Sequence, residues 1–142
     1  MWKYEHSVLT DASPQKVWEL YRKTSEWEKW DKGLKEVTLN GPFENGVTGS
    51  LTTISQEPLP FTLKEVKENE SFSNVTVLDA AGIQLDFYHR IEMDKSITKL
   101  IHGVVISGPN SKVMGNQIGP MITQGIPDAM SNLILLAGGK IL

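Results

Sequence analysis

The chain has 142 residues with a formal charge of −3, contains no cysteine, and by length predicts one domain over residues 1–142. The absence of cysteine excludes disulfides, thiolate nucleophiles and cysteine metal sites, and the scattered Lys and Arg argue against a nucleic-acid partner. No apolar run is long enough to cross a bilayer and no signal peptide opens the chain, so we expect a cytoplasmic protein without a transmembrane segment.

The N-terminal residues predict a strand followed by a helix. From Trp2 to Val8, apolar and polar residues alternate, which is typical of a half-buried strand. Ser13 precedes Pro14, a pattern of a hydroxyl cap and then Pro at the first helical position. A short helix therefore begins here, after the strand has stopped at Asp11.

A second short helix is predicted around two tryptophans. Trp27 and Trp30 lie one helical turn apart and form one side of it. Asp31 can accept a hydrogen bond from an indole or cap this turn. We favour a structural role in closing one end of a sheet, because Trp buries a large apolar surface.

The middle of the chain predicts six strands separated by turn signals. Asn40-Gly41-Pro42, Asn45-Gly46 and the pair Pro58 and Pro60 mark turns, and further turns are expected near residues 68–69, 81–82 and 94–95. The strands between them are expected at 37–39, 48–55, 61–66, 72–79, 83–93 and 97–107.

The stretch 109–142 is the only long run with helical spacing of apolar residues. Gly138 and Gly139 end it, and Gly125 to Pro127 predicts a kink. Two interpretations of the glycines in its first half stay open: they let the helix pack close to the sheet, or they leave space for a ligand. The apolar flank consists of Met114, Ile118, Met121, Ile122, Met130, Leu133 and Ile134.

Two histidines are predicted to point into the sheet interior. Alternation places His89 on the apolar face of strand 83–93 and His102 on the inner face of strand 97–107. A four-residue loop at 94–97 puts the two directly opposite, and a two-residue loop makes them diagonal neighbours. Either arrangement brings the rings within roughly 5 to 8 Å.

Several short patterns resemble the START-like (SRPBCC, helix-grip) superfamily, in its polyketide cyclase/dehydrase and lipid-transport branch. They are Trp2-x-Tyr-x-His6, Ser13-Pro14-x-x-Val17-Trp18, Trp27-x-x-Trp30-Asp31, Gly41-x-Phe43-x-x-Gly46-x-x-Gly49, Ser107-Gly108-Pro109 and Gly125-Ile126-Pro127-Asp128-Ala129. The resemblance covers nearly the whole chain and implies an α+β helix-grip fold. In that fold a seven-stranded antiparallel sheet curls around a long kinked C-terminal helix, with two short helices after the first strand.

The resemblance also implies a cavity between sheet and helix, which in relatives takes sterols, lipids, polyketides or plant hormones. It supplies no catalytic motif. The alternative is a filled core without a cavity. The expected ligand-binding lining comes from strand and helix phase: Leu85, Phe87, His89, Ile91, Leu100, His102, Val104, Met114, Ile118, Met121, Ile122 and Ile126.

Three functions remain open from the sequence. The first is binding of a small hydrophobic ligand, a lipid, polyketide-like or aromatic molecule, by a monomer or homodimer. The second is a cyclase, dehydratase or hydratase acting on a keto-compound, with His89 and His102 as candidate catalytic acid and base. The third is a protein-interaction module that uses an outer sheet edge. No cofactor is implied, and His6, His89 and His102 lack the carboxylates that support a metal site.

Overall fold

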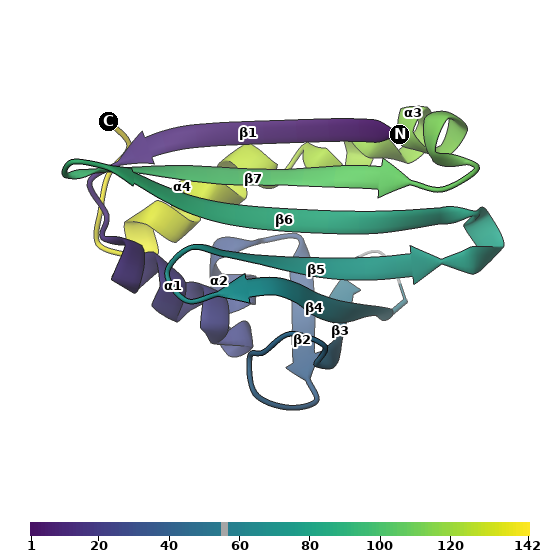
Figure 1. Ribbon diagram of the computed structural model, residues 1–142, viewed down its shortest axis with the longest axis horizontal. Coiled ribbons are helices and arrows are strands. Elements are labelled where there is room, and N and C mark those ends of the chain that lie inside the picture. The colour runs from purple at the N-terminus through teal and green to yellow at the C-terminus, as the bar shows by residue number, and fades with distance from the viewer. Residues whose placement is uncertain (55–56) are drawn as a thin grey trace.

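The computed structural model describes residues 1–54 and 57–142, and its seven strands form one antiparallel sheet in the order β1-β7-β6-β5-β4-β3-β2 (Figure 1). This confirms the fold expected from the resemblance. The strands are β1 Trp2–Thr10, β2 Leu34–Leu39, β3 Thr48–Thr53, β4 Leu59–Lys67, β5 Ser71–Leu78, β6 Ile83–Asp94 and β7 Ile97–Ser107.

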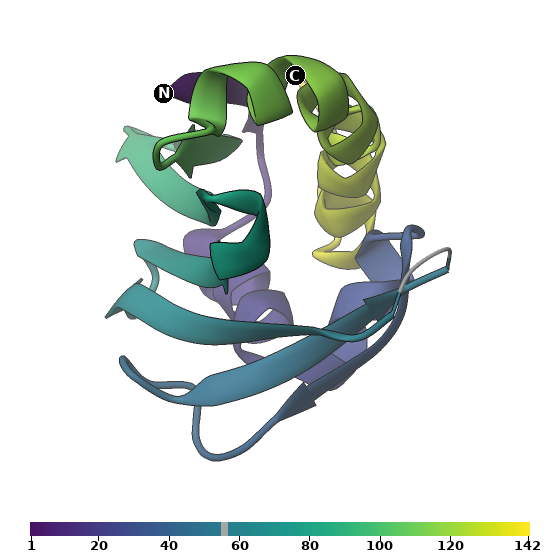
Figure 2. The same ribbon diagram turned by 90° about the vertical axis from the view of Figure 1, so that its right-hand side faces the viewer.

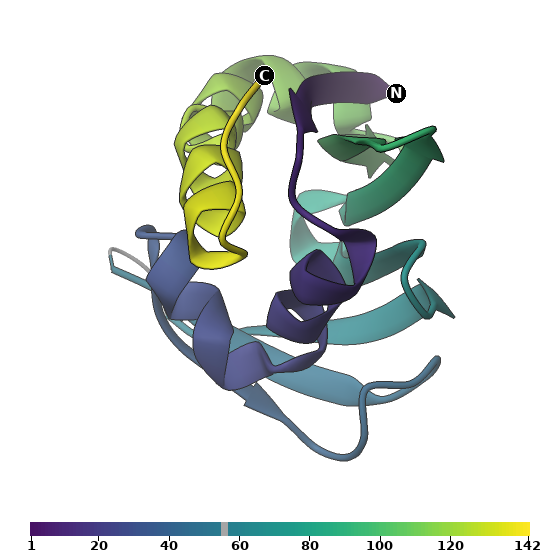
Figure 3. The same ribbon diagram turned by 90° about the vertical axis from the view of Figure 1, so that its left-hand side faces the viewer.

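The sheet curves strongly, and the helices lie on its concave side. Seen from its two ends, the sheet forms a bent wall whose open side is closed by the C-terminal helices (Figures 2 and 3). All strands but the first pair with their sequence neighbours, and β1 pairs with β7. The first and last strands therefore lie side by side, which brings the C-terminal helices next to the N-terminal strand.

Two short helices close one end of the sheet, as the sequence predicts. They are α1 Pro14–Arg22 and α2 Trp27–Trp30, joined by a 3₁₀ turn at Thr24–Glu26. The Ser13 side chain caps α1 by accepting from the Lys16 backbone N–H at 3.2 Å. Trp27 and Trp30 are both buried. Asp31 accepts from the Gly33 backbone N–H at 3.1 Å, so its partner is neither an indole nor the helical turn itself.

The C-terminal helix is broken into α3 Ser111–Thr123 and α4 Ile126–Leu136. The break at Gln124 and Gly125 confirms the predicted kink, and Pro127 occupies the first turn of α4. Gly138 follows the helix with φ +80°, the left-handed conformation in which glycine commonly ends a helix.

The glycines of this region divide between the two open interpretations. A Cβ on Gly115 or Gly119 would clash with the Trp2 side chain, so these two glycines serve close packing of α3 on β1. A Cβ on Gly125 would have no atom within 4 Å, and this glycine lines open space instead. The ligand-space interpretation is therefore wrong for the first two glycines.

Strand boundaries differ from the predictions around the third and fourth strands. The β4 strand begins at Leu59, so Pro60 lies inside it and does not bracket a turn. Proline is tolerated close to the start of a strand, where few ladder hydrogen bonds are lost. The predicted strand 48–55 ends at Thr53, and its last residue, Ser55, lies outside the described residues.

The buried apolar residues form two separate clusters. The larger one joins α1, α2 and α4 to the sheet and is rich in aromatic rings, among them Tyr21, Trp27 and Phe72. The smaller one packs α3 against Leu85, Val104 and their neighbours. Because the two clusters do not merge, the interior is not one solid core.

Candidate functional site

A cavity of about 860 Å³ lies between the concave face of the sheet and the C-terminal helices. Its volume falls in the range typical of small-molecule sites, roughly 300 to 1,000 Å³. Its walls come from α2, from the inner faces of β5, β6 and β7, and from α3 and α4, with β3 and the start of β4 at one side. A completely filled core, the alternative that the sequence left open, does not fit this geometry.

Most of the predicted lining residues border this cavity. They are Leu85, Phe87, His89, His102, Ile118, Met121, Ile122 and Ile126.

Four predicted lining residues are not among those that border the cavity. Ile91 and Leu100 are buried in the larger core cluster, while Val104 and Met114 pack in the smaller one. The strand residues do face inward, as predicted. The alternation of side chains shows which face of the sheet a residue occupies. It does not show whether that part of the face borders the cavity or is covered by a packed core cluster.

His89 and His102 lie directly opposite each other on β6 and β7. Their ring centroids are 4.6 Å apart with an interplanar angle of 79°, slightly closer than the expected range. The hairpin turn has only Lys95 and Ser96 between the paired residues Asp94 and Ile97. The expectation that a two-residue loop displaces the histidines to diagonal positions was therefore wrong, because this turn keeps the same register as the four-residue alternative.

Each histidine has one hydrogen-bond partner from a neighbouring element. His89 donates from Nδ1 to the Phe72 carbonyl oxygen at 3.2 Å, since a carbonyl can only accept, and its ring stacks on that of Phe72 at 4.0 Å. His102 Nε2 and the Tyr21 hydroxyl share a hydrogen bond of 2.6 Å. The neutral His89 ring therefore keeps a free lone pair on Nε2.

Burial keeps both imidazoles uncharged. It lowers the pKa of His89 to about 3, and the hydrogen bond to Phe72 opposes this only in part. Burial, together with the neighbouring His89 and His6, holds the pKa of His102 well below its ordinary value. Burial also raises the pKa of the Tyr21 hydroxyl. At neutral pH this group is a network of uncharged hydrogen-bonding side chains.

His6 pairs with His102 across β1 and β7 and is half-buried, but it is not among the residues that line the cavity. Within residues 1–54 and 57–142, no three His, Cys, Asp or Glu side chains gather as they do around a metal ion. No helix in this part of the chain has the length and apolar character needed to span a bilayer.

Sequence reasoning missed a polar part of the cavity wall. Trp30 and Asp31 at the end of α2 line the cavity, as do Thr53 on β3 and Asn74 on β5. The position of Asn74 could have been predicted. Successive side chains of a strand point to opposite faces, so Asn74 shares a face with Phe72. Trp30 and Asp31 carry no such signal, since the orientation of a four-residue helix depends on what it packs against.

Charge on the cavity wall is mainly negative. Asp31 and Asp128 border the cavity, and the basic residue among its lining is Lys32. Burial raises the pKa of the Asp31 carboxyl, and the hydrogen bond from Gly33 partly opposes this. A ligand with a carboxylate would therefore meet little compensating positive charge in this wall.

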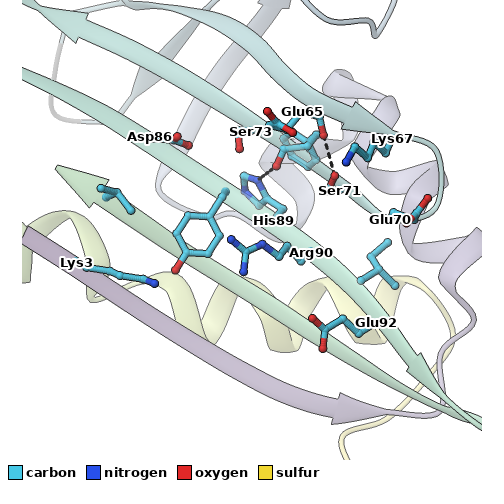
Figure 4. Close-up of a pocket in the computed structure, with 14 residues that line it drawn as sticks. Lys3, Glu65, Lys67, Glu70, Ser71, Ser73, Asp86, His89, Arg90 and Glu92 are labelled. Atoms are coloured by element: carbon cyan, nitrogen blue, oxygen red, sulfur yellow. Dashed lines mark hydrogen bonds between the residues drawn. The ribbon is translucent and has the colours of Figure 1, made fainter. Parts of the chain in front are cut away.

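A second hollow of about 460 Å³ lies on the opposite, outer face of the sheet (Figure 4). Half of its lining side chains are charged, with both signs present, including Lys3, Arg90 and Glu92. The Arg90 guanidinium lies 4.8 Å from the Tyr88 ring centroid, and the Ser71 hydroxyl donates to the Glu65 carbonyl oxygen at 2.8 Å. This charged surface differs sharply from the mainly apolar interior cavity.

Comparison with known proteins gives the fold. No protein-family model matches the chain. The uncharacterized protein YdcF of Bacillus subtilis (strain 168) is 30% identical over 61 residues, which cover 43% of this chain and 63% of that protein. The match thus spans less than two thirds of the curated relative.

Solved structures match almost the whole chain. The hypothetical protein jhp0584 from Helicobacter pylori has a TM-score of 0.76 at 14% identity, over 95% of this chain and 87% of that one. Ara h 8.0201 has a TM-score of 0.73 at 10% identity, over 92% and 93%. Norcoclaurine synthase from Thalictrum flavum, solved with dopamine and hydroxybenzaldehyde, has 0.70 at 13% identity, over 96% and 84%. The chain therefore shares the helix-grip fold of these solved structures.

Proposed function

We propose that the protein binds a small, mostly apolar molecule in the cavity between the sheet and the C-terminal helices. The observation that carries this proposal is the 860 Å³ cavity between two packed core clusters. Leu85, Phe87, Ile118 and Ile122 give it an apolar lining, and a few polar groups interrupt that lining. Apolar walls with a small number of placed polar groups are the usual composition of ligand sites.

The proposed ligand class is a lipid, a polyketide-like compound or an aromatic molecule. Norcoclaurine synthase, which shares the fold, was solved with the aromatic compounds dopamine and hydroxybenzaldehyde. Flat side chains in the cavity lining, among them Trp27, Trp30 and Phe87, would suit a planar ligand. The proposal includes a cytoplasmic location, which the absence of cysteine supports.

Acid and base catalysis by the histidine pair is the weaker alternative. A general base works best with a pKa near the working pH, and burial lowers the pKa of His89 to about 3. At neutral pH neither ring is in the charged imidazolium form that would act as a general acid. The two rings are better suited to orienting a ligand by hydrogen bonds. Turnover of a keto-compound that is lost when both histidines become Asn would favour the enzyme over the carrier.

A thermal-shift screen with lipids, flavonoids and polyketide-like aromatics tests the proposal, with native mass spectrometry to confirm one-to-one binding. A ligand at about 100 times its Kd adds about 2.7 kcal/mol of stability, so Tm should rise by about 5 °C or more. If no compound in a broad panel raises Tm, the binding function is wrong.

A further inference from the structure

Three polar side chains lie next to one another on the inner face of the sheet. Asn74 on β5, His89 on β6 and His102 on β7 all line the interior cavity. His89 lies directly opposite His102, and its partner on the other side is Phe72, two residues before Asn74. Neighbouring members of the group are therefore direct or diagonal neighbours across the strands. These three residues form the polar strip.

Each member of the polar strip has a hydrogen-bonding group that is still free. His89 and His102 each use one ring nitrogen, for the Phe72 carbonyl and the Tyr21 hydroxyl respectively. Within residues 1–54 and 57–142, the second nitrogen of each ring and the Asn74 amide have no partner. None of these atoms is among the buried side-chain atoms that lack a hydrogen bond in that part of the chain. They therefore keep accessible surface.

This accessible surface faces the interior cavity. Asn74 and His102 are 5% and 4% exposed, and both border the interior cavity but not the outer hollow. His89 borders both, but its ring lies on the inner face, where it stacks on the Phe72 ring at 4.0 Å. The outer face of β6 carries the alternate side chains, such as Tyr88. A ligand in the cavity therefore meets the His89 ring directly.

The hydrogen bond to Phe72 decides what kind of partner His89 requires. Because Nδ1 carries the ring proton, Nε2 of the uncharged imidazole can only accept. The adjacent His102 does not supply the donor, since the two described rings meet at 79° and no hydrogen bond joins them. A ketone, an ether and a carboxylate have no proton to donate, whereas an alcohol or a phenol has one.

We propose that the cavity ligand is a neutral alcohol or phenol whose hydroxyl donates to His89 Nε2, with the Asn74 amide as a second polar contact. This inference rests on the proposed function and names its ligand class. A buried acceptor that is left unpaired weakens binding, so a ligand without a hydroxyl proton is disfavoured. The Asn74 amide can donate as well as accept, so it is compatible with a hydroxyl oxygen.

NMR of the ¹⁵N-labelled imidazole rings tests the inference on the parent protein. The chain has three histidines, and the ring of His89 is assigned by nuclear Overhauser effects to the Phe72 ring on which it stacks. The probes are 1-naphthol, which can donate, 1-methoxynaphthalene, which can only accept, and 1-methylnaphthalene, which can do neither. An unprotonated ring nitrogen moves upfield when it accepts a hydrogen bond. With 1-naphthol bound, His89 Nε2 should therefore resonate upfield of its position with either other probe.

Affinities provide the second measurement. The parent should bind 1-naphthol about tenfold more tightly than 1-methoxynaphthalene, because the ether leaves the acceptor unpaired. His89→Phe keeps an aromatic ring against Phe72 but removes the acceptor, so this preference should disappear. His6→Phe is the matched control and should keep the preference. His6 pairs with His102 from the other side but does not line the cavity.

Equal affinities of the parent for 1-naphthol and its methyl ether, with the same His89 Nε2 position, overturn the inference but leave cavity binding intact. If the naphthalenes do not bind, the tightest hydroxylated compound of the thermal-shift panel and its methyl ether replace them. Binding of other panel compounds but of no alcohol or phenol also overturns the inference alone. Failure of every compound to bind overturns both the inference and the proposed function. The NMR measurement does not depend on the folding of a variant.

Discussion

A Cβ atom on Gly119 would lie 2.3 Å from Cζ2 of Trp2, far inside van der Waals contact. One turn earlier, a Cβ on Gly115 would lie 2.4 Å from the Cβ of the same tryptophan. The two glycines thus leave a flat surface on α3, and the Trp2 side chain packs against it. This contact sets how closely α3 approaches β1. It therefore sets the position of α3 over one end of the interior.

Gly119→Ala should destabilise the protein, although alanine is the better helix former by about 1 kcal/mol. The clash with Trp2 forces the helix and strand apart, and overpacking of this kind costs about 1 to 3 kcal/mol. Urea denaturation measures the change. Gly125→Ala is the matched control, because its Cβ would meet nothing within 4 Å, and it should change stability by less than about 0.5 kcal/mol. Equal effects of the two substitutions would contradict this account.

Tyr21→Phe should cost about 1 to 3 kcal/mol of unfolding free energy. The substitution keeps the packed ring but leaves His102 Nε2 without its 2.6 Å partner in the interior. Tyr88→Phe is the comparison, since its hydroxyl donates to Glu5, whose side chain is exposed and can be hydrated instead. The Tyr88 variant should lose less stability than the Tyr21 variant. A larger loss at Tyr88 would show that the Tyr21–His102 bond is not a main support of the site.

Stability should fall as the pH drops from about 7 toward 5. Both cavity histidines have folded-state pKa values below the unfolded value of about 6.5, so below that pH the unfolded chain binds more protons than the folded one. Their stabilising contribution is complete above pH 6.5 and is lost progressively as the pH falls toward the folded pKa, which is about 3 for His89. With a folded pKa of about 3, His89 should account for about 2 kcal/mol between pH 7 and pH 5, and His102 should act in the same direction.

Urea unfolding of the parent and of the double variant His89→Asn, His102→Asn at the two pH values measures this contribution. The difference between the two proteins isolates the histidines from carboxyl groups such as Asp31 and Asp86, whose pKa values burial raises. The double variant should show a flatter pH dependence. An unchanged slope would mean that the imidazoles are already hydrated and free to charge in the folded protein.

Strand phase was the reliable part of the sequence prediction. The alternation in 83–93 and 97–107 correctly placed His89 and His102 on one inner face, because a side chain's face depends only on the parity of its position in the strand. The helix break at Gly125 was equally local, since glycine and proline act on their own turn. Both features are determined by residues that are close together in the sequence.

Which residues line the cavity depends on contacts between segments that are far apart in the sequence. Local sequence patterns do not predict those contacts. Ile91 and Leu100 have the right phase but lie where α1, α2 and α4 fill the interior. Trp30 and Asp31 reach the cavity because the end of α2 packs against α4, where the Asn132 amide donates to the Trp30 carbonyl at 3.4 Å. No local pattern around Trp30 encodes that contact, which joins residues about a hundred positions apart.

Ile122→Trp should block ligand binding while leaving the fold intact. Ile122 on α3 is half-buried at the cavity wall and packs against the edge of the smaller core cluster, so a larger side chain has the hollow beside it to extend into. We expect the affinity for a cavity ligand to fall about tenfold or more, with little loss of stability, because the indole fills space that the ligand needs. Val113→Trp introduces the same side chain on the same helix at an exposed position outside the cavity lining, and it should bind normally. Isothermal titration with the best compound of the thermal-shift panel compares the two. If both variants bind like the parent, the ligand occupies a different surface from the cavity described here.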